Sequence, residues 1–338
     1  MSTKLRVFFN FFIRFAILAL SVFFLYVQFE KKIQTGGLSF SFGQLSATNI
    51  IIKLAIVFLL MFVNWASEIY KWRYLTSAFT NVSLGRCIKG VVSGITISMF
   101  LPNRIGDVAG KVLWLDSGSR WKGAFSNIYA SMAQVLATII VATAAVWYFA
   151  NIIPKDNEFV KTIVLLQWIT FAAASAGLLV YYRLRHFSKV LSKLKFRKIQ
   201  DIAAHSAVLD VFSNRKLTII LGLSIFRFLI YSFQFYLLLQ VFGVNVGFVE
   251  GMLVISVMYL FISFVPQFAI AEIATRGAIA VFVFQFLCIS CSLFAHSYES
   301  ALLFASSLLW LINLFVPAMA GLTMLPDVKR LKQKTRQK

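Results

Sequence analysis

Long apolar runs divided by short polar segments constrain the fold of this chain more than any other feature. A helix crosses the roughly 30 Å hydrocarbon core of a bilayer with about 20 apolar residues. Six runs have a length and composition close to those of such a span: residues 7–29, 50–65, 124–149, 162–182, 217–242 and 301–324. Because 60% of the residues are hydrophobic and only 13% are charged, the chain has more apolar surface than one soluble core would bury. The sequence predicts an all-α, polytopic integral membrane helical bundle.

Two further pairs of apolar segments are shorter and are each interrupted by a proline. The first pair covers about 88–101 and 105–115, and the second about 252–265 and 273–289. At a rise of 1.5 Å per residue, each segment of the first pair reaches only about 15 to 20 Å. Broken backbone is tolerated at membrane depth only where protein or trapped water surrounds it. We therefore predict two re-entrant helical hairpins whose tips lie inside the protein.

Basic residues gather between and after the apolar runs. The net charge of +21 would suit a nucleic acid, but the positive-inside rule and anionic headgroups account for charges in these places. We expect a lipid bilayer and no nucleic acid as the partner. The basic loop 183–216 and the basic tail 327–338 predict cytoplasmic N- and C-termini. Part of the loop has the pattern of either a surface amphipathic helix or a solvated connector helix.

Basic and aromatic residues are mixed at the end of the span 50–65. They predict a cytoplasmic interface, at Trp65, Tyr70, Lys71, Trp72, Arg73 and Tyr74.

The order of these elements repeats along the chain. The first half contains two spans, then a hairpin, then a third span. The second half contains the same elements in the same order, in the opposite orientation. We therefore predict a single domain, 1–338, built from inverted pseudo-repeats at about 1–150 and 160–326. In transporters with this layout, broken helices at matching positions mark a substrate site near the midplane.

Charged residues at the two predicted breaks are the candidate site. A charge at the bilayer centre costs about 2.5 to 3.5 kcal/mol on insertion scales, so these groups must face each other, water or a ligand. Residues three or four apart share one helix face, and an asparagine after the first proline is suited to cap a helix whose free N–H groups attract anions. With one arginine inside a span, the substrate-binding candidates are Asn103, Arg104, Asp107, Lys111, Arg227, Glu272 and Arg276.

The surplus of positive charge among these residues favours a phosphate, for which a lipid headgroup is the commonest source in a membrane. The alternative is purely structural. In that case Arg104 with Asp107, and Glu272 with Arg276, only neutralise one another and hold the hairpins together. The spacings Gly90-x-x-x-Gly94 and Gly106-x-x-x-Gly110 predict close packing between the two arms of the first hairpin.

The same residues carry a family resemblance. Leu101-Pro-Asn-Arg-Ile-Gly-Asp-Val-Ala109 resembles the Pro-x-Arg-x-Gly-Glu signature of the lysylphosphatidylglycerol synthase transmembrane, or flippase-like, family of bacterial and archaeal membrane proteins. The segment 266–277 lies where that family has its second Pro…Glu motif. Asp107 stands in place of the usual glutamate, and the second motif lacks the family's Gly-Gly run. The resemblance implies a lipid-handling module in a cell inner membrane.

Three functions are compatible with these features. The first is a flippase or transporter of an anionic phospholipid or isoprenoid-linked lipid. The second is an intramembrane enzyme acting on lipid phosphates, for which we find no catalytic or nucleotide-binding motif. The third is a membrane scaffold that moves nothing. We expect no cofactor, no metal and no catalytic residue, and we do not expect lipid aminoacylation because no long polar segment is present to form the soluble synthase domain.

Overall fold

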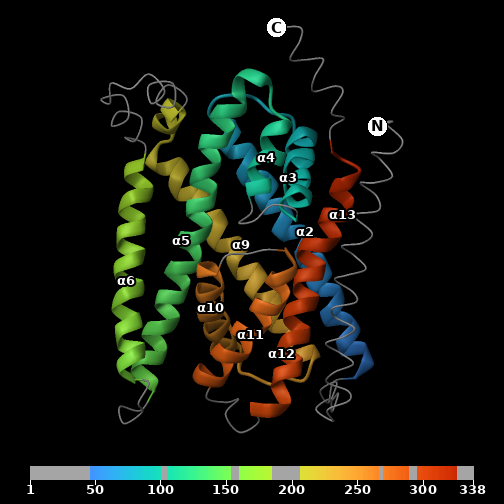
Figure 1. Ribbon diagram of the computed structural model, residues 1–338, viewed down its shortest axis with the longest axis vertical. Helices are drawn as coiled ribbons and strands as arrows, with labels where there is room; N and C mark the ends of the chain where they lie inside the picture. The colour runs from blue at the N-terminus through green and yellow to red at the C-terminus, as the bar shows by residue number, and fades with distance from the viewer. Residues whose placement is uncertain are drawn as a thin grey trace.

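A computed structural model describes residues 46–99, 105–153, 160–184, 206–265, 269–288 and 295–325, without the side chains of 269–274 and 295–297. Every regular element within these residues is helical (Figure 1). The all-α prediction is therefore confirmed. The first predicted span, 7–29, and the tail, 327–338, lie outside the described residues.

Five stretches in the described part of the chain are long and apolar enough to cross a membrane. They comprise α2 (Ala47–Thr76), α5 (Arg120–Ile152), α6 (Val160–Arg183), α9 (Asn214–Val241), and α12 (Ala295–Trp310) with its continuation. After α12 the chain makes a π-helical turn, η6 (Leu311–Phe315), and continues as α13 (Val316–Leu322). Each stretch contains or closely matches one predicted span, so the chain is a multi-pass membrane protein.

Helix α2 differs from the prediction at its C-terminal end. Serine 46 caps its start, with Oγ accepting from the backbone N–H of Asn49. The helix then continues 11 residues beyond the predicted span 50–65, to Thr76. Lys71 and Trp72 are only 2% and 1% exposed, so the predicted interfacial belt is wrong for these two residues. They are buried because other helices supply partners for them, which local hydropathy does not reveal.

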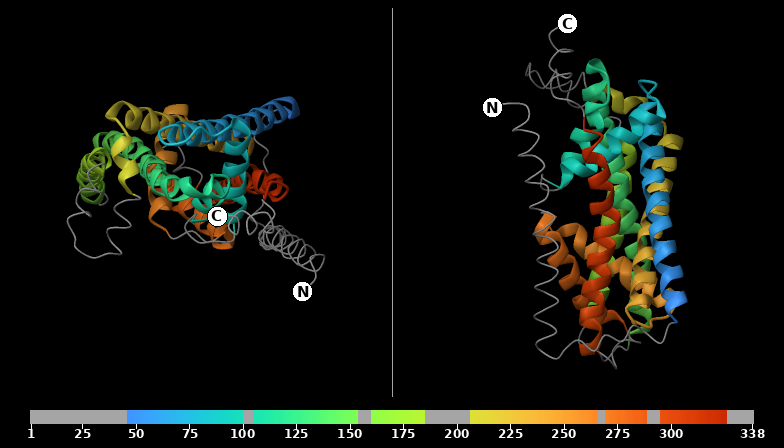
Figure 2. Two further views of the ribbon diagram at one scale, coloured as in Figure 1. Left: turned by 90° about the horizontal axis from the view of Figure 1, so that it is seen from above. Right: turned by 90° about the vertical axis from the view of Figure 1, so that its right-hand side faces the viewer.

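The four short segments form two pairs of packed helices. Helix α3 (Leu84–Ser98) packs against α4 (Ile105–Leu113), and α10 (Phe248–Phe264) packs against α11 (Ala269–Leu287). Figure 1 and the right-hand view in Figure 2 show α3 and α4 in one half of the molecule and α10 and α11 in the other. The re-entrant course of these pairs and the inverted repeat stay predictions.

Glycines bring α3 and α4 into backbone contact. A Cβ atom on Gly110 would collide with the backbone of Gly94, and one on Gly106 would collide with the backbone of Ile97 and Ser98. Close packing between these arms, predicted from the glycine spacing, is confirmed. Helix α13 secures α3 from its other side, where Thr96 Oγ1 donates to the carbonyl oxygen of Ala318 at 2.9 Å.

Aromatic residues fix the chain where it returns after the basic loop. Tyr129 of α5 packs edge-to-face against Tyr181 of α6 and against Phe212, with ring centroids 5.6 and 5.1 Å apart. The hydroxyl of Tyr181 donates to the carbonyl oxygen of Leu217 at 3.0 Å. These contacts hold the start of α9 beside α5 and α6. The segment with the predicted amphipathic pattern lies outside the described residues.

Candidate functional site

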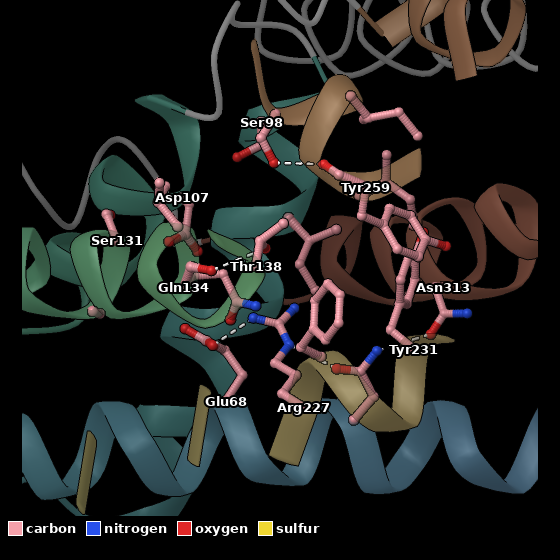
Figure 3. Close-up of a pocket in the computed structure, with 18 of the residues that line it drawn as sticks. Glu68, Ser98, Asp107, Ser131, Gln134, Thr138, Arg227, Tyr231, Tyr259 and Asn313 are labelled. Atoms are coloured by element: carbon pink, nitrogen blue, oxygen red, sulfur yellow. Dashed lines mark hydrogen bonds and ion pairs between the residues drawn. The ribbon is translucent and has the colours of Figure 1, made fainter. Parts of the chain in front are cut away.

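A cavity of about 570 Å³ lies among the helices that carry the predicted site residues. Its wall is formed by α2, α3, α4, α5, α9, α10, α11, the last residue of α12 and the turn between α12 and α13. This volume is within the range of about 300 to 1,000 Å³ that is usual for small-molecule sites. Figure 3 shows Glu68, Asp107 and Gln134 on one side, Tyr231, Tyr259 and Asn313 on the other, and Arg227 between them.

Glu68 of α2 is the centre of the charged side of the cavity. Its Oε1 accepts from Lys111 Nζ at 2.7 Å, while its Oε2 contacts Lys71 Nζ at 2.8 Å and Arg227 Nη1 at 2.6 Å. Three cations, which come from α2, α4 and α9, therefore share one carboxylate. Because a buried charge is tolerated only when it is paired and hydrogen-bonded, these contacts hold the three helices together around the cavity.

Lys111 is the most completely bonded of the three cations. Besides Glu68, its Nζ donates to Asp107 Oδ2 at 2.7 Å and to Asn127 Oδ1 at 3.3 Å. It also lies 5.6 Å from the centroid of the Trp72 ring. An ammonium group has three N–H donors, so all of its donors have partners. Asp107 and Lys111, four apart on α4, share a helix face as predicted.

Arg227 is placed differently, with part of its side chain reaching the cavity. Its Nε donates to Asn64 Oδ1 at 2.6 Å, and its guanidinium carbon lies 5.0 Å from the centroid of the Trp65 ring. The side chain is 17% exposed, against 1% for Lys111. A guanidinium has five N–H donors in a planar fork, and the contacts to Asn64 and Glu68 use Nε and Nη1. The Nη2 edge is therefore available to an acceptor in the cavity.

The other side of the cavity also contains an arginine. Arg276 of α11 is buried and donates through Nη1 to the hydroxyl of Tyr231 at 3.0 Å. Tyr231 lies four residues after Arg227 on α9, so both residues are on one face of that helix. The rings of Tyr231 and Tyr259 are 5.3 Å apart. Helix α9 therefore connects the two arginine-containing sides of the cavity.

A polar contact also links the cavity to the π-helical turn. Asn64 Nδ2 donates to Asn313 Oδ1 at 3.2 Å, and Trp65 Nε1 donates to the carbonyl oxygen of Asn313 at 3.1 Å. Single π-helical turns are frequent at functional sites. Here the turn places Asn313 against the residues that hold Arg227.

Residues 11–321 match the family described as the lysylphosphatidylglycerol synthase TM region. The chain belongs to this family. No curated protein and no solved structure gives a significant match. The family membership and the membrane-spanning helices identify the chain as an integral membrane protein related to lipids, and they confirm the resemblance carried by the two proline-containing motifs.

The structure places four of the seven predicted site residues around one cavity. These four are Asp107, Lys111, Arg227 and Arg276. Asn103 and Arg104 lie outside the described residues, and so does the side chain of Glu272. Their predicted roles, including the pairs Arg104–Asp107 and Glu272–Arg276, stay predictions.

Sequence reasoning missed Glu68 and Lys71, although the charged side of the cavity is organised around Glu68. These residues follow an apolar run and stand among aromatic residues, a pattern that is also typical of a membrane interface. The spacing of Asn64, Glu68 and Lys71 was the available signal, because positions four and then three residues apart lie on one face of a helix. Among the described residues, no group of three or more His, Cys, Asp or Glu side chains is arranged to hold a metal ion.

Proposed function

We propose that this chain is a lipid flippase or transporter that binds an anionic headgroup in the central cavity. The observation that carries the proposal is the cluster of three cations, Lys71, Lys111 and Arg227, against two carboxylates, Glu68 and Asp107. The cluster therefore has one more positive charge than negative charge, inside a membrane protein. An anionic headgroup would balance this charge, and family membership supports a lipid as its source.

Arg227 is the residue that we expect to contact the headgroup phosphate. Its side chain is partly exposed to the cavity. The Nη2 edge of its guanidinium makes no contact within the charged cluster. Arginine–phosphate contacts are often bidentate and charge-assisted. Lys111, in contrast, has each of its donors directed at a protein oxygen, and its role is to hold α4 against α2 and α5.

The proposed location is a cell inner membrane, with both termini in the cytoplasm. Figure 1 shows the C-terminal ends of α2 and α6 and the N-terminal ends of α5 and α9 at the end of the bundle that also carries α3 and α4. The basic residues of these segments include Arg73, Arg86, Lys89, Arg120, Lys122, Arg183, Arg215 and Lys216. The positive-inside rule supports a cytoplasmic position for this end.

The test is lipid movement by the purified chain in vesicles. A fluorescent anionic phospholipid is placed in both leaflets, and its transfer to the outer leaflet is followed by chemical quenching from outside. Arg227→Gln is expected to reduce the rate about tenfold or more, because charge-assisted hydrogen bonds contribute about 1.5 to 3 kcal/mol. The variant should stay folded, since Glu68 retains Lys71 and Lys111 as partners.

Lys53→Gln is the matched control. Like Arg227, Lys53 is a cation that joins α2 and α9: it lies on α2, and its Nζ donates to Gln240 Oε1 of α9 at 2.7 Å, but it does not line the cavity. We expect its transport rate to stay within about twofold of wild type, since its hydrogen bond has no part in the cluster. Equal rates for folded wild type and Arg227→Gln, or equal losses in both variants, would contradict the proposal.

A further inference from the structure

A chain of three hydrogen bonds connects Arg227 to the π-helical turn. Arg227 Nε donates to Asn64 Oδ1 at 2.6 Å, and Asn64 Nδ2 donates to Asn313 Oδ1 at 3.2 Å. Asn313 Nδ2 in turn donates to the carbonyl oxygen of Leu309 at 3.3 Å. Asn64 and Asn313 are only 2% and 4% exposed. Water therefore has little access to these two amides, and each depends on protein partners for its hydrogen bonds.

The chemistry at the two ends of this chain fixes its direction. A guanidinium only donates, so Asn64 must turn its oxygen toward Arg227 and its NH₂ group toward Asn313. A backbone carbonyl only accepts, so Asn313 must turn its NH₂ group toward Leu309 and its oxygen toward Asn64. Neither amide can flip without placing two donors or two acceptors against each other. Asn313 therefore determines which end of the Asn64 amide faces Arg227.

The same turn also holds the aromatic residue that contacts Arg227. Trp65 Nε1 donates to the carbonyl oxygen of Asn313 at 3.1 Å, and the Trp65 ring centroid lies 5.0 Å from the guanidinium carbon of Arg227. In an α-helix this carbonyl would accept from the residue four positions later, which is Pro317 and has no N–H. The proline thus leaves the carbonyl oxygen of Asn313 open to the indole. Two side chains of α2 that contact Arg227, those of Asn64 and Trp65, are therefore both bound to Asn313.

Arg227 needs this support because its ion pair alone leaves the guanidinium free to turn. Its Nη1 meets Glu68 Oε2 at 2.6 Å, and the other oxygen of that carboxylate accepts from Lys111. A guanidinium can rotate about one hydrogen bond, whereas bonds to Nε and Nη1 together fix the plane of its fork. This plane sets the direction of Nη2, the edge that we expect to contact a phosphate. Contacts between arginine and phosphate depend on such geometry.

From this geometry we propose that Asn313 is a positioning residue of the anion site. It acts through Asn64 and Trp65, which set the plane in which Arg227 meets a phosphate. This inference rests on the proposed function and adds a residue of the turn between α12 and α13 to the control of the headgroup site. Helix α13 begins directly after this turn and is secured to α3 through Thr96. The orientation of the arginine therefore depends on how α12 and α13 are joined.

The test measures lipid binding by the purified chain and its variants. Phosphatidylmethanol and diacylglycerol with identical acyl chains are each titrated into detergent-solubilised protein, and bound lipid is measured by native mass spectrometry. The two lipids differ in the phosphate group, so the ratio of their affinities reports the contact with Arg227. We expect Arg227→Gln to lower the affinity for phosphatidylmethanol about tenfold and to leave the affinity for diacylglycerol unchanged.

Two variants of Asn313 should weaken phosphatidylmethanol binding although Arg227 is still present. Asn313→Ser shortens the side chain away from Asn64, while its hydroxyl can still donate to the carbonyl oxygen of Leu309, four residues earlier. Asn313→Leu removes every hydrogen-bonding group of the side chain. We expect each variant to lower the affinity about three- to tenfold, because a misdirected guanidinium keeps its charge and loses its hydrogen bond to the phosphate. The serine variant keeps the test independent of whether the leucine variant folds.

The background in which Asn313 is changed separates a positioning role from a structural one. In Arg227→Gln the arginine is absent, so adding Asn313→Ser should change the phosphatidylmethanol affinity by less than about twofold. A residue that only stabilised the fold would affect both lipids and would do so in either background. Ser307→Ala is the matched control: Ser307 lies on α12, is buried and donates through Oγ to the carbonyl oxygen of Leu303, but it does not line the cavity. We expect both of its lipid affinities to match wild type.

The results distinguish failure of this inference from failure of the proposed function. Unchanged phosphatidylmethanol affinity in folded Asn313→Ser, or an equal loss in the wild-type and Arg227→Gln backgrounds, would overturn the positioning role and leave the anionic site in place. A loss shared equally by diacylglycerol would also overturn it. Equal affinities of wild type for the two lipids would instead contradict the proposed function, because the phosphate would then not be recognised.

Discussion

The two pairs of short helices approach the cavity by different kinds of contact. In α3 and α4, glycines allow the backbones to touch, as at Gly94 and Gly110. In α10 and α11, large side chains fill the space, and the rings of Phe261 and Phe282 pack edge-to-face with centroids 6.4 Å apart. Backbone contact fixes one helix against the other with little freedom to adjust, whereas side-chain packing can rearrange.

The difference extends to the charges that each pair brings to the cavity. The first pair supplies Lys111, which contacts Glu68, Asp107 and Asn127. The second supplies Arg276, which donates to the hydroxyl of Tyr231. The comparison therefore indicates that ion pairs fix the α3–α4 side, whereas side-chain packing and the hydrogen bond from Arg276 to Tyr231 contribute on the α10–α11 side.

Removing the charge of Glu68 is expected to have the largest effect. Glu68→Gln leaves Lys71, Lys111 and Arg227 without their shared carboxylate, and breaking a buried ion pair from one side costs about 3 to 5 kcal/mol. Unfolding by SDS titration in mixed micelles measures this loss. The double variant Glu68→Gln/Lys71→Met should recover part of it, because one of the unpaired cations is also removed.

An unchanged unfolding midpoint for Glu68→Gln would show that the cluster does not hold α2, α4 and α9 together. A double variant less stable than Glu68→Gln would show that Lys71 stabilises the fold through contacts other than its ion pair, such as the one with Ser224 Oγ at 3.4 Å. Either result would remove the contrast between a charge-fixed side and a packed side.

Alanine at one glycine of α4 and at one glycine of α11 compares a backbone contact with a side-chain contact, which for Gly277 is made with Leu303 of α12. Gly110→Ala places a methyl group against the backbone of Gly94, whereas Gly277→Ala places one against Leu303 Cδ2, the flexible end of a side chain. We expect Gly110→Ala to cost about 1 to 3 kcal/mol through overpacking, and Gly277→Ala to cost less than about 1 kcal/mol. The same SDS titration measures both. Gly222→Ala, with no atom near its Cβ position, is the control for helix propensity.

Equal destabilisation by Gly110→Ala and Gly277→Ala would contradict the distinction between rigid and adjustable packing. The reverse order would place the rigid contact in α11 and α12.

The five spans in the described part of the chain were predictable because hydropathy is a local property and the bilayer sets a fixed length. The pair Asp107–Lys111 and the glycine contacts were also predictable, since both depend on helical spacing within a few residues. Glu68 was not, because its partners Lys111 and Arg227 lie 43 and 159 residues away in the sequence. Its own neighbours, Trp65 and Trp72, resemble an interfacial belt. A charged residue just after an apolar run gains its burial from distant partners, which one sequence without its fold does not reveal.

Deletion of the Tyr231 hydroxyl should have the smallest effect of these changes. Tyr231→Phe removes the acceptor for Arg276 Nη1 and keeps the ring that packs against Tyr259. Hydrogen bonds to charged groups contribute about 1.5 to 3 kcal/mol. Because Arg276 and Tyr231 both line the cavity, we expect water to take the place of the lost hydroxyl in part. The expected loss of stability is therefore about 1 kcal/mol, measured by SDS titration. Tyr148→Phe, on the exposed face of α5, is the control and should change the stability by less than about 0.5 kcal/mol. A loss as large as that of Glu68→Gln would mean that Arg276 holds α11 as firmly as Lys111 holds α4, and the two sides of the cavity would then be built alike.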